Sequence, residues 1–186
     1  AQELYNDDIF VGYRYYDTFG KDVSYEFGYG GSYTTFAMQT QSVTADKDKV
    51  TVKVKVKNTG SVSGKEVAEV YFSAPEGNLD KPYQELAGYA KTDELAPGES
   101  QVLTITYDTT EMGSYDTDKA AYVMEDGDYI IRVGNSSRNT HVAGKISVAE
   151  DTITEQYSNL MVPVKDNPNV ADDEKYPTLE PMTTEG

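Results

Sequence analysis

The chain lacks cysteine and tryptophan, and His141 is its single histidine. The absence of cysteine excludes disulfides, thiolate nucleophiles and Cys-ligated zinc. A Ser-His-Asp triad needs a histidine, but His141 follows a turn in an alternating run, where a surface position on a strand is the favoured interpretation. One histidine also cannot form a zinc site by itself. The sequence therefore predicts no catalytic residue and no metal site.

Positive charge and long apolar runs are also scarce. Lys and Arg number 16 against 32 for Asp and Glu, which gives a net charge of −16. A chain this acidic repels nucleic acids and anionic membrane surfaces, so neither is a predicted partner. No stretch approaches the roughly 20 apolar residues that span a bilayer. We interpret the chain as a soluble piece of a longer protein and leave its compartment, cytoplasmic or secreted, open.

Motifs that hold phosphates or calcium are weak or absent. The stretch FGYGGSY, residues 27–33, clusters glycines, but no basic residue lies near it and no phosphate-loop motif occurs. ADKDK at 45–49 and EDGDY at 125–129 are not part of a calcium-binding loop of roughly 12 residues with its closing Glu. Paired acids elsewhere lie in turn or linker contexts, where solvated carboxylates are the default. The sequence therefore predicts no cofactor.

What the sequence does contain is alternation. Between residues 36 and 149 apolar and polar residues alternate, with turn signals between the runs, which predicts an all-β antiparallel sandwich of about seven strands. In the clearest strand, Val50–Asn58, the valines face one side and the lysines the other. Further strands are predicted at Gln84–Thr92, Gln101–Tyr107, Ala120–Met124, Asp128–Val133 and His141–Val148.

The run EVAEVYFSA, residues 66–74, is a second strong strand signal. Its register predicts Ala68, Val70, Phe72 and Ala74 inward, with Glu69 and Tyr71 among the residues on the opposite face. The intervening turn NTGSVSG, residues 58–64, makes this run the expected hairpin partner of Val50–Asn58.

Two flanks differ in composition from this middle region. Residues 1–35 form an expected extended arm rich in tyrosine and glycine, and residues 150–186 hold four of the seven prolines and an excess of acids. The second flank cannot close a core of its own. Two interpretations stay open for it: a disordered tail, or an acidic linker that crosses a neighbouring domain, anchored by Tyr157, Leu160, Met161 and Val162.

Two stretches together resemble glycoside hydrolase family 3 enzymes of the β-glucosidase type. Residues 5–36, which include GYRYYD and FGYGGSYTTF, are similar to the end of that family's α/β sandwich domain. Residues 64–108, with the LAPGES turn, and the later VGNSSR at 133–138 are similar to its fibronectin type III-like domain. Gly31 and Glu26 depart from the family pattern, which usually has Leu and often Pro there.

The resemblance implies retaining hydrolysis of β-linked glycosides by an aspartate nucleophile on a (β/α)8 barrel and an acid/base from the α/β sandwich domain. Neither catalytic motif matches a position here, so the resemblance implies an accessory module and its flanks. In the common domain order this module ends the protein, whereas in some bacterial members the barrel follows it; a 37-residue flank running onward resembles the second order.

The arm is then expected to dock the module against the catalytic barrel and α/β sandwich domains. It has more aromatic side chains than a short edge segment can hide, and its glycines allow a tight turn or a close approach. The predicted interdomain packing residues are Tyr13, Arg14, Tyr15, Tyr16, Phe27, Gly28, Tyr29, Gly30 and Tyr33. Two alternatives remain: a carbohydrate-binding module that stacks glycans on exposed tyrosines, and one chain of a cleaved β-glucosidase.

Overall fold

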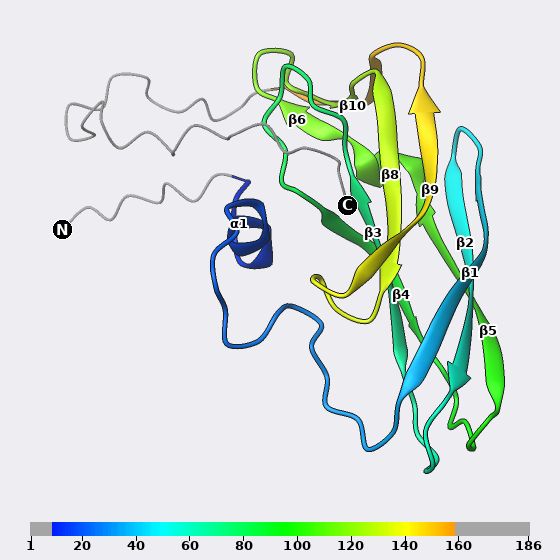
Figure 1. The fold of residues 1–186 in the computed structure, drawn as a ribbon. Helices are drawn as coiled ribbons and strands as arrows, with labels where there is room; N and C mark the ends of the chain where they lie inside the picture. The colour runs from blue at the N-terminus through cyan, green and yellow to red at the C-terminus, as the bar shows by residue number, and fades with distance from the viewer. Residues whose placement is uncertain (1–8, 159–186) are drawn as a thin grey trace.

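Two antiparallel sheets form the body of the molecule in the computed structural model, which describes residues 9–158 (Figure 1). One sheet has the strand order β1–β2–β5 and the other β4–β3–β8–β9. Together these seven strands confirm the predicted all-β sandwich. Their bounds are β1 Phe36–Ala45, β2 Lys49–Asn58, β3 Val67–Ser73, β4 Glu85–Lys91, β5 Ser100–Asp108, β8 Gly127–Gly134 and β9 Thr140–Val148.

Three short strands form a small additional sheet at one end of the sandwich. Its order is β10–β7–β6, with β6 at Ser114–Asp116, β7 at Ala121–Met124 and β10 at Thr152–Gln156. The 3-10 helix η1, Thr109–Met112, leads from β5 into it. β1, β6 and β10 were not among the strands predicted individually from the sequence, and β10 lies within the range that was expected to be a linker.

The core lies between the two large sheets because their inward faces are apolar. The four valines of β2 at positions 50, 52, 54 and 56 are fully buried, as their alternation predicted. Leu103 and Ile105 of β5 and Ile131 and Val133 of β8 pack in the same cluster. Burial of each such side chain contributes roughly 1.5–3 kcal/mol, so the period-two pattern places a large favourable contribution between the two sheets.

The predicted hairpin between β2 and β3 is wrong. β2 pairs with β1 and β5, whereas β3 pairs with β4 and β8 in the opposite sheet. The connection, residues 59–66, is longer than the roughly 2–5 residues of most hairpin loops and crosses between sheets. The fully buried Asn58 shapes this crossing, because its amide Nδ2 donates to the carbonyls of Val62 and Leu95, each at 2.8 Å.

β3 is buried on both faces. Ala68, Val70 and Phe72 face the core as predicted, but Glu69 and Tyr71 on the opposite face are only 7% and 0% exposed. A single sandwich cannot bury the outer face of one of its own sheets, so another segment must cover it.

The arm supplies that cover. Its short helix α1, Tyr13–Thr18, lies beside the sheet β4–β3–β8–β9, on the side away from β1–β2–β5 (Figure 1). The arm was expected to be extended, and a six-residue helix is too short to be stable in isolation. It persists here because Tyr13 and Asp17, one helical turn apart, and the adjacent Thr18 all contact the sandwich.

The C-terminal flank begins as part of the fold. β10 pairs with β7, and the N–H of Tyr157 donates to the carbonyl of Ala120 at 2.8 Å. The other expected anchors, Leu160, Met161 and Val162, lie outside the described residues. Within residues 9–158, no helix is long and apolar enough to cross a membrane.

Candidate functional site

The contact surface between the arm and the outer face of β3, β4 and the 134–138 turn is called the seam below. At its centre, Tyr13 stacks on Phe27 with ring centroids 4.5 Å apart and meets Tyr71 edge-on at 6.2 Å. The Tyr13 hydroxyl accepts a hydrogen bond from the Leu86 N–H at 2.8 Å. Burial raises the pKa of Tyr13, so the hydroxyl stays protonated across the working pH range. One arm tyrosine thus joins both stretches of the arm to β3 and β4.

Two arginine–carboxylate pairs cross the seam. Arg14 Nη1 lies 3.1 Å from Glu85 Oε1, and Arg138 Nε lies 2.8 Å from Asp17 Oδ1. Arg138 also donates through Nη2 to the carbonyl of Lys21 at 2.6 Å. The Asp17 side chain is 6% exposed, so its pairing with Arg138 compensates a buried charge and is a stronger restraint than a surface ion pair.

The second arm stretch, Glu26 to Gly28, binds the turn after β8. The Ser137 N–H donates to the Phe27 carbonyl at 2.8 Å, and the Ser136 hydroxyl bonds to Glu26 Oε1 at 3.1 Å. Gly28 follows with φ +80°, and a Cβ added there would lie 2.8 Å from Cδ of Glu69. Both the backbone conformation and the close approach require glycine at this position.

Beneath Gly28, a carboxylate and a phenol form a buried pair. The Tyr71 hydroxyl donates to Glu69 Oε2 at 2.6 Å. Burial raises the pKa of Glu69, and the Tyr71 hydrogen bond only partly opposes this. Burial also raises the pKa of Glu85 despite its pairing with Arg14. The seam therefore covers two carboxyl groups that resist ionisation.

The nine predicted packing residues divide into three sets. Tyr13, Arg14, Phe27 and Gly28 contact the sandwich, as described above. Tyr15 packs within the arm on Phe19, with centroids 4.8 Å apart. The others face outward: Tyr16 is 44% exposed, Tyr29 56% and Tyr33 100%, and Gly30 has open space around it and no positive φ. The required glycine is thus Gly28 rather than Gly30, and the interdomain role of the outward set stays a prediction.

Sequence reasoning missed six residues that form the seam. They are Asp17 and Glu26 in the arm, and Glu69, Tyr71, Glu85 and Arg138 in the sandwich. The sequence held a signal for Glu69 and Tyr71, because the large aromatic ring of Tyr71 interrupts the polar face of β3. Such a ring indicates that this face is covered. No sequence pattern pairs Asp17 with Arg138, which lie 121 residues apart.

A small cleft is lined entirely by residues of the arm. Its volume is about 250 Å³, and its lining consists of Gly12, Tyr13, Tyr16, Asp17, Val23, Tyr25, Glu26 and Phe27. It combines aromatic rings with two carboxyl groups.

Across the part of the chain that is described, no group of three or more His, Cys, Asp or Glu residues could hold a metal ion. His141 is exposed on β9 and lies 3.3 Å from the Thr40 hydroxyl.

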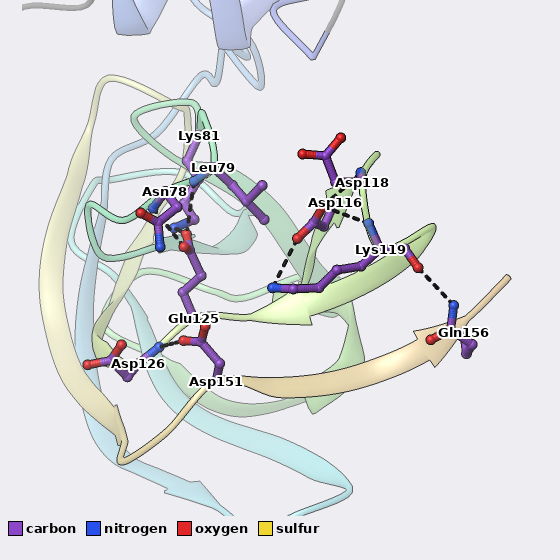
Figure 2. Close-up of polar contacts among 10 residues, drawn as sticks. All are labelled: Asn78, Leu79, Lys81, Asp116, Asp118, Lys119, Glu125, Asp126, Asp151 and Gln156. Atoms are coloured by element: carbon purple, nitrogen blue, oxygen red, sulfur yellow. Dashed lines mark hydrogen bonds and ion pairs between the residues drawn. The ribbon is translucent and has the colours of Figure 1, made fainter. Parts of the chain in front are cut away.

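Another buried carboxylate, that of Glu125, fixes the loop between β3 and β4, and Figure 2 shows its contacts. The carboxylate accepts hydrogen bonds from the N–H groups of Asn78 at 2.7 Å and Leu79 at 3.3 Å, and it forms a buried ion pair with Lys81. We call this group the clamp. Burial alone would raise the pKa of Glu125, but the Lys81 and backbone donors outweigh it and lower the pKa.

The small sheet continues from the clamp. The N–H of Asp126 donates to Asp151 Oδ1 at 2.9 Å, and Gln156 Nε2 donates to the carbonyl of Lys119 at 3.0 Å (Figure 2). Asp116 caps the β6–β7 turn through the N–H groups of Asp118 and Lys119. β10 is therefore held by side chains at both ends as well as by its pairing with β7.

Known proteins match both the sandwich and its flanks. Residues 66–137 match the model of the fibronectin type III-like domain. Beta-glucosidase A of Butyrivibrio fibrisolvens is 39% identical over 97% of this chain and 25% of its own length. A beta-glucosidase structure from Paenibacillus barengoltzii superposes with a TM-score of 0.79 at 46% identity, over 84% of this chain and 19% of that one. Beta-glucosidase 3B of Thermotoga neapolitana gives a TM-score of 0.76 at 45% identity, over 81% and 21% of the two chains.

The fold and the domain match define the class of protein: a fibronectin type III-like β-sandwich. The relatives make the assignment more specific: the chain corresponds to the fibronectin type III-like region of glycoside hydrolase family 3 β-glucosidases. The resemblance drawn from the sequence is thereby confirmed. The chain spans about a quarter or less of the length of these relatives.

Proposed function

We propose that this chain is the accessory module of a larger β-glucosidase-like enzyme that hydrolyses β-linked glucosides or oligosaccharides. In this proposal the module docks the catalytic barrel and α/β sandwich domains through its arm and stabilises them. The names of the relatives and the small share of their length that the chain spans support the enzyme context.

The observation that carries the docking role is the two-sided character of the arm. Its inner side is bonded to the sandwich through the seam. Its outer side leaves four aromatic side chains between 44% and 100% exposed: Tyr16, Tyr25, Tyr29 and Tyr33. Exposed aromatic clusters of this kind mark interaction surfaces, and tyrosine is enriched among the residues that dominate binding energy.

The seam also gives this surface a defined shape before any partner binds. Gly28, the two arginine pairs and the Ser137–Phe27 hydrogen bond fix the backbone on which the exposed rings stand. A surface that is already ordered loses less conformational entropy on docking, which favours affinity.

The test is to mix the chain with separately produced barrel and α/β sandwich domains of the parent enzyme. We expect a complex in sedimentation and a higher melting temperature of the catalytic domains. Replacing Tyr25 and Tyr29 together by Ser should weaken binding at least about tenfold, because truncation of one interface anchor commonly costs more than 1 kcal/mol. The matched control is Val102→Ser, which removes a 46% exposed apolar side chain from the opposite sheet and should leave binding unchanged.

A chain that neither binds nor stabilises these domains would overturn the docking proposal.

A carbohydrate-binding role is disfavoured because neighbouring exposed tyrosines are tilted against one another rather than coplanar: 36° for Tyr25 and Tyr29, and 62° for Tyr115 and Tyr122. Retardation of the chain in gels containing soluble β-glucan would favour that alternative. Cleavage of a chromogenic β-glucoside by the purified chain would favour a hydrolase.

A further inference from the structure

We propose that the cleft on the arm binds a cationic side chain, an arginine or lysine presented by the docked domain. This inference rests on the proposed docking function and specifies the chemistry of the partner surface.

The lining of the cleft is the first argument. Of its eight residues four are aromatic and two are acidic, and none is Lys, Arg or His. Tyr16 and Tyr25 are 44% and 71% exposed, so part of each side chain is accessible to an incoming group. A guanidinium or ammonium group is attracted both to aromatic faces and to carboxylates, and an arginine side chain matches this combination.

The carboxylate of Asp17, which lines the cleft, is only partly hydrogen-bonded. Its side chain is 94% buried, and Oδ1 is paired with Arg138, but the buried Oδ2 has no hydrogen-bond partner in the part of the chain that is described. A buried carboxylate oxygen without a donor is costly. Because Asp17 also lines the cleft, a cation held there adds positive charge close to this under-bonded carboxylate.

The charge of the chain selects a cation over other occupants. The net charge of −16 disfavours an acidic partner at this surface, and Glu26 adds a second carboxylate to the cleft wall. Among the described residues, the Glu26 carboxylate accepts one hydrogen bond, from the Ser136 hydroxyl to Oε1. A neutral sugar can also stack on aromatic rings and bond to carboxylates, but it gains nothing from the excess negative charge. The experiment must therefore distinguish a cation from a neutral sugar as the occupant of the cleft.

The experiment titrates the full 186-residue chain, labelled with ¹⁵N, with N-acetyl-arginine amide. N-acetyl-citrulline amide, which has the same shape without the charge, and glucose are the comparison probes. We expect the arginine probe to shift the amide signals of Gly12, Asp17 and Glu26, with the citrulline probe binding at least about tenfold more weakly, since hydrogen bonds and π contacts of a charged group exceed those of a neutral one.

Two variants locate the binding. Glu26→Gln keeps the acceptor for Ser136 and removes the charge, and Tyr25→Leu removes one aromatic face; each should weaken the arginine probe about two- to fivefold. Glu76→Gln removes the same charge from an exposed loop position away from the cleft lining and should leave the affinity unchanged.

Equal binding of arginine and citrulline probes, shifts confined to residues outside the cleft, or cleft shifts with glucose alone would each overturn the inference. If docking to the catalytic domains persists while the arginine probe leaves the cleft unperturbed, this inference fails and the proposed function stands. If the probe binds the cleft but no docking occurs, the proposed function fails and the cleft remains a cation site.

Discussion

The seam and the clamp each place a carboxyl group under a folded segment, and their electrostatics are opposite. In the clamp, Glu125 receives an ammonium group and two backbone N–H donors, which lower its pKa. In the seam, Glu69 receives the single donor of Tyr71, and its pKa is raised by burial. The difference shows that the supply of donors, rather than burial alone, decides whether a covered carboxyl group favours ionisation.

This contrast also implies a difference in local stability between the clamp and the seam. The clamp anchors the β3–β4 loop with a fully satisfied ionised carboxylate. The seam instead leaves Asp17 Oδ2, Gln84 Oε1 and the Ser137 hydroxyl buried without partners among the described residues. Such orphaned groups lower the stability of a contact, so we expect the arm to open more readily than the loop.

The largest expected effect comes from the clamp. Replacing Glu125 by Ala leaves the Lys81 ammonium, 7% exposed, without its counter-charge and releases the N–H groups of Asn78 and Leu79. Breaking a buried pair in this way costs about 3–5 kcal/mol, and chemical denaturation should show that loss of unfolding free energy.

The control for this variant is Asp126→Asn. Asp126 is the next residue and is exposed, and its hydrogen bond to Asp151 uses the backbone N–H, which the change retains. Its effect should stay within about 0.5 kcal/mol. A Glu125→Ala protein as stable as this control would contradict the role assigned to the clamp.

A smaller and local effect is expected in the seam. Gly28→Ala puts a Cβ against the Glu69 carboxylate at φ +80°, and should weaken arm packing by about 1–3 kcal/mol. Hydrogen exchange should report this as faster exchange of the Ser137 N–H, which bonds to Phe27, with little change in the β2 core.

Gly30→Ala provides the matched comparison, because Gly30 has open space and no positive φ. The two variants should therefore differ. Equal protection of Ser137 in both would show that Gly28 does not fix the arm.

The smallest effect is a pH dependence of opposite sign in the two regions. For Glu69 and Glu85, whose pKa values are raised above the ordinary 4.5, the stability contribution is complete below pH 4.5 and is lost as pH rises through the raised values. For Glu125, whose pKa is lowered, the contribution is complete above 4.5 and is lost as pH falls through the lowered value.

The measurement follows two amide signals by NMR between pH 3 and 7, a range of about 4 units that brackets the ordinary carboxyl pKa. The seam signal of Ser137 should change above pH 4.5 and the clamp signal of Asn78 below it. Glu69→Gln should reduce the seam response and leave the clamp response intact. Parallel changes of both signals in one pH range would refute the contrast.

The sandwich was predictable because alternation is a local property of the chain. The alternating valines of β2 identify its buried face without any knowledge of the strands that pair with it. The other predicted strands begin and end within about two residues of their observed bounds. Strand pairing was less accessible, because the partner of a buried strand depends on which sheet it joins. The hairpin expected between β2 and β3 failed for that reason.

The seam was harder to predict than the sandwich. The tyrosine-rich arm could be identified from composition, and Tyr13, Arg14, Phe27 and Gly28 were among the residues named. Their partners come from sequence positions 69 to 138 and share no pattern with the arm, since such contacts follow only from the tertiary arrangement. The helix α1 was missed because six residues carry too little periodicity.

The most direct test of the docking account is hydroxyl-radical footprinting of this chain alone and of the intact parent enzyme. The account predicts that Tyr25, Tyr29 and Tyr33, which are 71%, 56% and 100% exposed here, become protected in the enzyme, while Val102 on the opposite sheet is oxidised equally in both. Equal oxidation of the three tyrosines in the chain and in the enzyme would contradict the account.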